Sequence, residues 1–447
     1  MTLYLELYES LKSQIISGDY ETDDKLPSKR QLEKHLNVSQ TTIERAYELL
    51  LDEGFIYSKP RSGYYVSKLE VLPVVRKTQI ELDEKTIKKD YTYSFETAQV
   101  DLEHFPFDTF RKLSRQVFDA PYEHLLNEDY NEGLYELRQQ IAKYLFNSRG
   151  VSASHDQIII GSSTNQLMEY VVRLLNNHTF MIESPSYPPA KMVLEKHKID
   201  YMTLPLESDG INIDDVKNSH RDVIFITPSH HFPTGSVMTI EKRTQLLKWA
   251  YEKENRYIIE DDYDSEFRYF KKPLPALQSL DTESRVIYIS TFSKALFPML
   301  RMAYMVLPKH LVEDFHRLKY KESNTVPIHT QQIVALFLRS GHFDRHLNKM
   351  RNIYEKKITY IMKRLKPYET ELTVSGEQAG MHFVLTVTNG RTLDDCLKRA
   401  KTRDLKIEPM KTYDKNHTDV SFVIGFGSIP FSQLERHMDV LIDALTG

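Results

Sequence analysis

Residues 290–301 read Ser-Thr-Phe-Ser-Lys-Ala-Leu-Phe-Pro-Met-Leu-Arg, and they directly follow the apolar run Val-Ile-Tyr-Ile at 286–289. A short apolar run that stops where polar residues begin predicts a buried strand in a sheet covered on both faces. Lys294 and Arg301 then lie just beyond the strand, with small hydroxyl side chains beside the lysine. A lysine amine can form a Schiff base with a carbonyl, and an arginine with hydroxyls can hold a phosphate. The stretch predicts a small-molecule site at a strand end.

The pattern of a short apolar run followed by polar residues recurs along most of the chain. It predicts strands at 158–160, 223–226, 257–259 and 286–289, and two later strands near 382–387 and 420–426. Because helical patterns alternate with these runs, we expect a mostly parallel central sheet covered by helices, with functional groups at the strand ends. The sequence predicts one large α/β domain over residues 93–447 that ends in a smaller α+β subdomain.

Residues 26–45 read Leu-Pro-Ser-Lys-Arg-Gln-Leu-Glu-Lys-His-Leu-Asn-Val-Ser-Gln-Thr-Thr-Ile-Glu-Arg, which predicts a helix-turn-helix. We expect Leu32 and Leu36 to face inward, because they recur at helical spacing. Residues 54–57 and 64–66 predict two strands around a basic hairpin, or wing. Polar side chains face outward near the start of the second helix, where such a helix reaches base edges: Gln40, Thr41, Thr42 and Arg45. Basic residues cluster locally beside them and on the wing: Lys29, Arg30, Lys59 and Arg61.

Composition limits the classes of protein that the chain can belong to. The 447 residues carry a net charge of −4, and residues 1–68 hold nine Lys and Arg against eleven Asp and Glu, so DNA contact must come from the local clusters. No apolar run approaches the roughly 20 residues that span a bilayer, and the start lacks the pattern of a signal peptide. One cysteine, Cys396, allows neither an internal disulfide nor a cysteine zinc site. We expect a cytoplasmic protein with no metal site.

A set of residue types outside the lysine stretch suits pyridoxal 5'-phosphate. Ser163 and Thr164 open a helix whose free amides favour an anion. Asp261, at a strand end, can pair with a protonated ring nitrogen, which makes the ring an electron sink. Tyr263 can donate to the ring hydroxyl, and Tyr187 offers a flat face for stacking. Each residue alone has a plain structural interpretation, but the ordered set indicates a cofactor site.

Two known families resemble the two parts of the chain. Residues 1–67 resemble the winged helix-turn-helix of GntR-type regulators, and the resemblance implies DNA contacts also at Ser39 and Gly63. The remainder resembles fold-type I, class I aminotransferases, and the whole chain resembles the MocR/GabR-type regulators that fuse the two. The matching stretches include Leu-Pro-Ser at 26–28, Glu-Ser-Pro-Ser-Tyr at 183–187, Thr-Pro-Ser-His-His-Phe-Pro-Thr-Gly at 227–235, Glu-Asp-Asp-Tyr-Asp-Ser-Glu-Phe-Arg-Tyr at 260–269, Thr-Phe-Ser-Lys at 291–294 and Gly-Met-His at 380–382. A polar linker is predicted between them at 68–92.

The resemblance implies a role for each residue of the set. Lys294 would hold the cofactor as a Schiff base, Asp261 would pair with the ring nitrogen, and Tyr263 with the ring hydroxyl. Tyr187 would stack on the ring. The phosphate cradle would comprise Ser163, Thr164, Thr291, Ser293 and Arg301.

Three positions depart from the aminotransferase pattern. Phe232 stands where those enzymes have an asparagine that touches the ring, and His231 is the neighbour that could replace it. Val423 stands near the position of their carboxylate-binding arginine. Pro189 occupies the place of a second arginine that GABA-responsive relatives use. These losses weaken the case for an ordinary amino acid as ligand.

The sequence leaves three functions open. The first is a homodimeric transcriptional regulator of a double-stranded DNA operator that senses a small amine or amino acid at the cofactor on Lys294. The second is a sensor of pyridoxal phosphate itself. The third is an active aminotransferase with an appended DNA-binding domain, against which the lost arginines argue.

Overall fold

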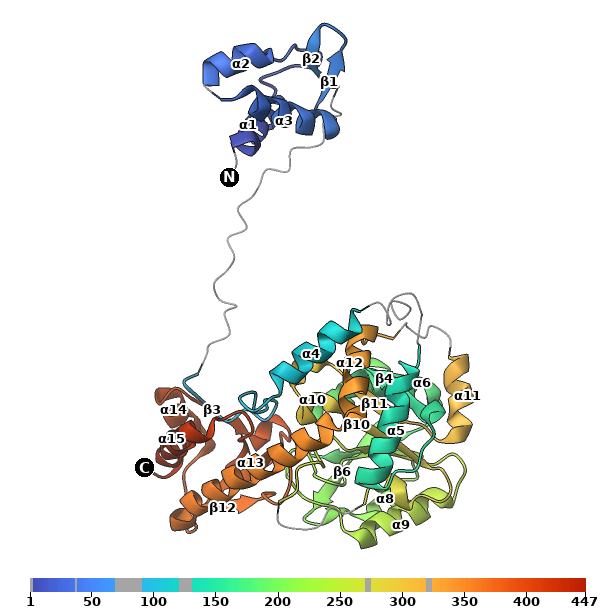
Figure 1. The fold of residues 1–447 in the computed structure, drawn as a ribbon. Coiled ribbons are helices and arrows are strands. Elements are labelled where there is room, and N and C mark those ends of the chain that lie inside the picture. The colour runs from blue at the N-terminus through green and yellow to red at the C-terminus, as the bar shows by residue number, and fades with distance from the viewer. Residues whose placement is uncertain (1–2, 37, 69–90, 120–130, 270–274, 319–323) are drawn as a thin grey trace. The chain divides into compact units, whose positions relative to one another are not determined.

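The structure, a computed structural model, describes residues 3–36, 38–68, 91–119, 131–269, 275–318 and 324–447. The chain divides into two compact units, Met1–Lys89 and Asp90–Gly447 (Figure 1). Most of the predicted linker at 68–92 lies outside the described residues, so its conformation stays a prediction.

The first unit is a small helical domain with a β-hairpin. Its elements are α1 (Leu3–Ser17), α2 (Lys29–Leu36), α3 (Gln40–Asp52), β1 (Ile56–Lys59) and β2 (Gly63–Val66). The hairpin is antiparallel, with Lys59 opposite Gly63. Buried Leu11, Leu32 and Ile43 pack the helices together. Leu36 does not face inward as we expected: it is 45% exposed, because it is the last residue of α2 and lies beyond the packed part of that helix.

The second unit is built on a mixed, mostly parallel sheet. Strands β10, β9, β8, β5 and β6 run parallel, whereas β11 is antiparallel to both β10 and β4. The four strands predicted in this sheet are confirmed, and β5, β6, β7 and β11 are additional. In order across the sheet the strands are β4 (Ile158–Gly161), β11 (Ala303–Val306), β10 (Val286–Thr291), β9 (Tyr257–Asp261), β8 (Val223–Ile226), β5 (Phe180–Ser184), β6 (Tyr201–Glu207) and β7 (Gly210–Ile211).

Helices cover both faces of this sheet, as its apolar strands require. Ile287 and Ile289 point to one face, which packs against α6 (Thr164–Leu174), α7 (Pro188–Lys196) and α11 (Lys309–Arg317). Val286 and Tyr288 point to the other face. That face packs against α5 (Tyr135–Arg149), α8 (Ile213–Asn218), α9 (Ile240–Tyr251) and α12 (Ile328–Arg339).

A C-terminal subdomain carries an antiparallel sheet, and its two predicted strands are confirmed. In order the strands are β12 (Leu372–Ser375), β13 (His382–Val387), β16 (Ser421–Gly425) and β15 (Glu408–Pro409). A separate parallel pair joins β3 (Tyr93–Ser94) to β14 (Leu405–Lys406). The accompanying helices are α13 (His342–Leu365), α14 (Leu393–Thr402) and α15 (Leu434–Thr446), whereas α4 (Phe107–Val117) packs against α12. None of the helices in the described ranges has the length and apolar character needed to span a bilayer.

Candidate functional site

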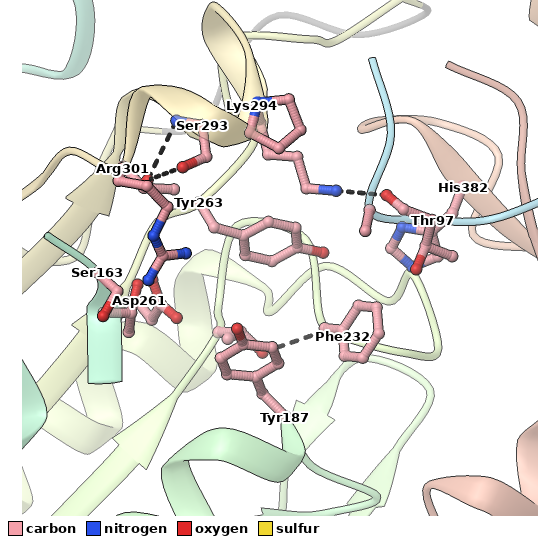
Figure 2. Close-up of a pocket in the computed structure, with 15 residues that line it drawn as sticks. Thr97, Ser163, Tyr187, Phe232, Asp261, Tyr263, Ser293, Lys294, Arg301 and His382 are labelled. Atoms are coloured by element: carbon pink, nitrogen blue, oxygen red, sulfur yellow. Dashed lines mark hydrogen bonds between the residues drawn. The ribbon is translucent and has the colours of Figure 1, made fainter. Parts of the chain in front are cut away.

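The carboxyl ends of neighbouring parallel strands meet at one edge of the large sheet and open into a cavity. Thr227, Asp261 and Thr291 lie at or just beyond the ends of β8, β9 and β10. The cavity has a volume of about 250 Å³ (Figure 2). Its lining contains all nine residues predicted to hold the cofactor, together with Thr97, Ala98, Thr227, Phe232, Pro298 and His382.

Lys294 extends into this cavity from α10 (Phe292–Ala295), the short helix that follows β10. Its Nζ donates a hydrogen bond to the carbonyl oxygen of Thr97. Burial lowers the pKa of Lys294 to about 8, against a small opposing effect of Asp264. A lysine amine that loses its proton near neutral pH is a nucleophile, so this side chain can attack a carbonyl carbon.

Asp261 lies at the end of β9 with a carboxylate that is not satisfied by the protein. Burial, with the negative charge of neighbouring Asp262, raises the pKa of Asp261 to about 8. Its Oδ1 is buried and has no hydrogen-bond partner, whereas Asp262 accepts from Arg149 Nε at 2.7 Å. A buried carboxylate oxygen that lacks a donor leaves a place for one from a ligand. The residue therefore fits a protonated pyridine nitrogen.

One side of the cavity presents hydrogen-bond donors that can bind an anion. Ser163 caps α6 and accepts a hydrogen bond from Gln166 N at 3.3 Å. Thr291 Oγ1 donates to Ser293 Oγ at 3.0 Å. Arg301, which ends η5 (Pro298–Leu300), directs its guanidinium toward Ser163 and Asp261 (Figure 2). A helix N-terminus, hydroxyls and a guanidinium are the donors that hold a phosphate.

The backbone of Arg301 has a conformation that points to a constraint at this site. Its φ of 49° and ψ of 55° lie in the left-handed region, which a residue with a Cβ adopts at a cost of about 1–2 kcal/mol. Such backbone strain concentrates at functional sites, where the surrounding structure holds it in place. The conformation returns the chain from η5 so that the arginine faces the cavity.

Aromatic side chains form the other wall of the cavity. Burial raises the pKa of Tyr187 to about 12, so its hydroxyl stays protonated at physiological pH. The Phe232 ring lies edge-to-face against Tyr187, with ring centroids 5.8 Å apart. His231 does not replace the missing asparagine: it is absent from the lining, and its Nδ1 bonds to Thr234 Oγ1 at 2.8 Å.

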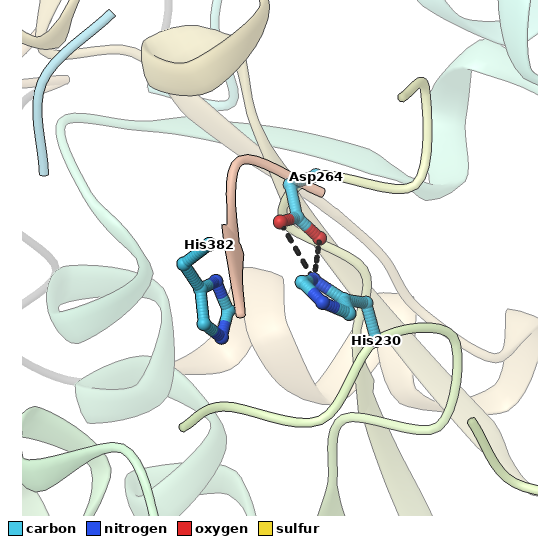
Figure 3. Close-up of side chains that lie close together, drawn as sticks. All are labelled: His230, Asp264 and His382. Atoms are coloured by element: carbon cyan, nitrogen blue, oxygen red, sulfur yellow. Dashed lines mark hydrogen bonds and ion pairs between the residues drawn. The ribbon is translucent and has the colours of Figure 1, made fainter. Parts of the chain in front are cut away.

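A buried group that the sequence did not predict adjoins this wall and comprises His230, Asp264 and His382 (Figure 3). His230 Nδ1 is 2.8 Å from Asp264 Oδ2, and Tyr263 Oη is 3.2 Å from the same nitrogen. His382 adds a third side chain, and the three have ligand atoms within 4.8 Å of one another, a spacing that suits a metal. The contacts connect Tyr263 to a buried carboxylate through an imidazole. We expected no metal site, and that stays a prediction; His230 Nε2 is buried without a hydrogen-bond partner.

Sequence reasoning did not identify Thr97 and Ala98 as lining residues. They lie in a stretch without regular structure between β3 and α4, and no motif marks them. The stretch reaches the pocket because Gly425 N donates to Phe95 O at 2.8 Å. Phe232 and His382 were within recognised motifs, but their position in the wall depends on the fold.

The predicted DNA contacts lie in the first unit. Gln40, Thr41 and Arg45 are exposed near the start of α3, whose cap Ser39 accepts from Thr42 N at 3.3 Å. Arg30 is exposed on α2, while Lys29 is half-buried and bonds Glu44 at 3.0 Å. On the hairpin, Lys59 and Arg61 are exposed, and Gly63 turns the chain with a φ of 112°. The surface is thus a helix end beside a basic hairpin.

Comparison with known proteins agrees with this two-part organisation. The sequence pattern of the class I and II aminotransferases matches residues 125–403, and that of the bacterial regulatory proteins of the gntR family matches residues 3–66. The HTH-type transcriptional regulator YdeL of Bacillus subtilis is 36% identical over 97% of this chain and 95% of its own length. The probable rhizopine catabolism regulatory protein MocR of Rhizobium meliloti is 31% identical over 88% of this chain and 83% of its own length.

A solved structure shows the same fold for the second unit. The multiple substrate aminotransferase of Thermococcus profundus superposes with a TM-score of 0.72 at 20% identity, over 81% of this chain and 93% of that enzyme. The chain therefore belongs to the MocR-type transcriptional regulators of the GntR family, in which a helix-turn-helix DNA-binding domain is joined to an aminotransferase-like domain.

Proposed function

We propose that this regulator holds pyridoxal 5'-phosphate on Lys294 and that its affinity for an operator depends on the state of that site. The observation that carries the proposal is one cavity that contains a lysine of lowered pKa, an unpartnered buried carboxylate oxygen on Asp261, and a cluster of possible phosphate donors around Arg301. The cofactor would supply an aldehyde carbon to which an amine nitrogen can bond. The signal would be a small amine or amino acid, or the cofactor itself.

Different residues of the cavity would contact different parts of the cofactor. Asp261 would hold the proton on the ring nitrogen, and Arg301 with Ser163, Thr164, Thr291 and Ser293 would bind the phosphate. Tyr187 would stack on the ring, and Tyr263 would donate to its hydroxyl. Release of Lys294 would free its Nζ to donate to Thr97 O, the hydrogen bond that the unmodified lysine makes. A signal of this kind needs a coupling of about 1–3 kcal/mol between ligand and DNA.

Absorbance and chemical trapping test the proposal. Purified protein mixed with pyridoxal phosphate is expected to gain a band near the visible edge, and borohydride reduction followed by peptide mass mapping is expected to find the adduct on Lys294. An adduct on another lysine, or none, would contradict the proposal. Operator affinity is measured with and without cofactor, and then with added amines. This comparison identifies whether the cofactor or an amine is the signal.

An active aminotransferase remains the competing function, because the fold matches such enzymes. We expect no sustained turnover, since neither Val423 nor Pro189 can bind a carboxylate. Repeated conversion of an amino acid and a keto acid, monitored by product formation, would favour the enzyme.

We also propose that the chain acts as a two-fold dimer on a repeated or palindromic operator. Two-fold pairing is the commonest arrangement of identical subunits, and it places two DNA-binding domains on two half-sites. Sedimentation of the full chain with and without a two-site DNA duplex tests this. A monomer on each duplex would exclude it.

A further inference from the structure

Positive charge in the cavity lies close to the cofactor groups and not at the aromatic wall. Among the described residues, one lysine and one arginine line the cavity: Lys294 and Arg301. Figure 2 shows Arg301 beside Ser163, with Phe232 and His382 on the opposite side. Under the proposed function Lys294 is bonded to the aldehyde and Arg301 to the phosphate. No lining cation of the described residues is then left for an effector.

The histidines near the aromatic wall do not replace the missing charge. Burial, with electrostatic effects of the neighbouring His230 and Lys294, lowers the pKa of His382 well below its usual value. His382 Nε2 lies 3.2 Å from the carbonyl oxygen of Pro233, to which a neutral ring can donate. Burial also lowers the pKa of His231 to about 3. Both rings are therefore neutral at physiological pH and cannot form an ion pair with a carboxylate.

The aromatic wall is held in place by its own contacts. The Phe232 ring meets those of Tyr263, His382 and Tyr413 edge-to-face, with centroids 6.3, 5.4 and 5.1 Å apart. Phe232 N donates to Thr227 Oγ1 at 3.3 Å, which anchors the loop. The phenyl side chain offers no hydrogen bond to a ligand. The Phe232 part of the wall therefore suits an apolar body and offers no partner to a polar group.

Among the described residues, no cation would pair with a carboxylate buried against this wall, and a buried unpaired charge is strongly unfavourable. Asp264 adds to this effect, because its negative charge is close enough to act on Lys294. We propose that the effector is a primary amine without a carboxylate, whose aromatic or aliphatic body packs on Phe232, and that Phe232 determines this specificity. The inference rests on the proposed function.

The exchange that this inference requires is balanced without an oxidant or reductant. The amine nitrogen bonds to the aldehyde carbon while the bond from that carbon to Lys294 Nζ breaks. Two protons pass from the incoming nitrogen to Nζ, because the double bond from the carbon moves from one nitrogen to the other. Lys294 is released as an amine, and its Nζ is again free to donate to Thr97 O.

Matched pairs of ligands test the inference. The cofactor-loaded full chain is titrated with 2-phenylethylamine and with L-phenylalanine, and separately with butylamine and with 4-aminobutyrate. In each pair the acid carries one carboxylate, in place of a hydrogen in the first pair and of the terminal methyl in the second. Absorbance reports displacement from Lys294, and the change in Tm reports binding independently. We expect each amine to displace the lysine at a concentration at least tenfold lower than its acid partner, because a buried unpaired charge costs more than this factor.

Substitutions test whether the aromatic wall determines the preference for an amine without a carboxylate. Phe232→Asn is expected to raise the concentration of 2-phenylethylamine needed by about tenfold, the smaller end of the range for lost apolar contact in a pocket. Phe431→Asn, on an exposed phenylalanine outside the lining, serves as the control and is expected to change nothing.

The outcomes separate this inference from the proposed function. Absence of an adduct on Lys294 would defeat the proposed function and the inference together. With the adduct present, equal or tighter binding of the acids would overturn the inference alone. Failure of all four ligands to displace Lys294 would overturn it as well and favour the cofactor as the signal.

Discussion

Lys294 Nζ donates a hydrogen bond to the carbonyl oxygen of Thr97, although the two residues are 197 positions apart in the chain. Thr97 belongs to the stretch that begins the second unit, directly after the residues predicted as a linker. That stretch is attached to the C-terminal subdomain: Phe95 N donates to Lys406 O at 3.1 Å, and Glu96 forms an ion pair with Lys406. The lysine proposed to hold the cofactor is therefore in direct contact with the segment that leads toward the DNA-binding unit.

Lys294→Ala is expected to abolish the absorbance band and the borohydride adduct while leaving non-specific DNA binding intact, because the DNA surface lies in a separate unit. Loss of the bond to Thr97 is also expected to speed backbone hydrogen exchange around residues 93–101. Lys363→Ala, on the exposed surface of α13, is the control and should leave all three unchanged. An adduct that persists in Lys294→Ala would contradict the assignment.

The rate at which the cofactor attaches should depend on pH through Lys294. The neutral amine is the reacting form, and burial lowers the pKa of Lys294 to about 8 from an ordinary value near 10.5. We expect the rate to rise with pH up to about 8 and to level off above it. Stopped-flow absorbance from pH 6 to 10 measures this. A rate that keeps rising toward pH 10 would show that the lysine is not perturbed.

Asp261→Asn is expected to have opposite effects on the empty and the loaded protein. The raised pKa of Asp261 means that the folded protein binds this proton more tightly than the unfolded chain does. Its contribution to stability therefore becomes less favourable from about pH 4 to about pH 8, and the amide removes that cost. The Tm of the empty variant at pH 8 should equal or exceed that of the parent.

Cofactor affinity of Asp261→Asn should fall by about tenfold to a hundredfold, since a hydrogen bond to a charged group contributes about 1.5–3 kcal/mol. Equilibrium dialysis of the cofactor gives the affinity, and calorimetry gives the Tm. Unchanged affinity would exclude a ring-nitrogen contact at this residue. The affinity and Tm measurements are repeated at pH 5 as a control, because the Asp261 carboxyl of the folded parent is then protonated.

Arg30→Ala is expected to weaken binding to all DNA sequences by a similar factor, because a phosphate contact does not read bases. The slope of log affinity against log salt should decrease in magnitude by about one. Fluorescence anisotropy at several salt concentrations measures both. Lys363→Ala removes one charge from the other unit and should leave the slope as it is. A loss confined to one operator sequence would instead indicate base contact.

Gly380→Ala should destabilise the second unit and disturb the cavity. Gly380 has a φ of 69°, and a Cβ there would collide with the His230 ring and with Asp264 Oδ2. Left-handed backbone and overpacking together cost about 3 kcal/mol. Gly390→Ala is the matched control: its φ is 83° and no atom lies within 4 Å of the added Cβ, so about 1 kcal/mol is expected. Urea unfolding compares the two, and equal losses would contradict the collision.

The sequence by itself determined the strands that carry the candidate site and the motif residues at their ends. Apolar runs at 223–226, 257–259 and 286–289 became β8, β9 and β10, because burial on both faces of a parallel sheet demands such runs. Motif residues that follow a strand, such as Asp261 and Lys294, reached the cavity because parallel strands end at one edge. The N-cap of α3 and the exposure of Gln40, Thr41 and Arg45 also followed from local pattern, whereas Thr42 is half-buried.

The tertiary structure alone decided which distant groups meet and which charges are perturbed. Thr97 reaches Lys294, and His230 meets Asp264, through packing that no sequence spacing encodes. Burial raises the pKa of Asp261 and lowers that of Lys294, and burial is a property of the whole fold. Leu36 is the reverse case: a correct helical period predicted an inward side chain, but α2 ends at that residue and leaves it exposed. Local pattern sets the direction of a side chain along its element, whereas its neighbours depend on where the other elements pack.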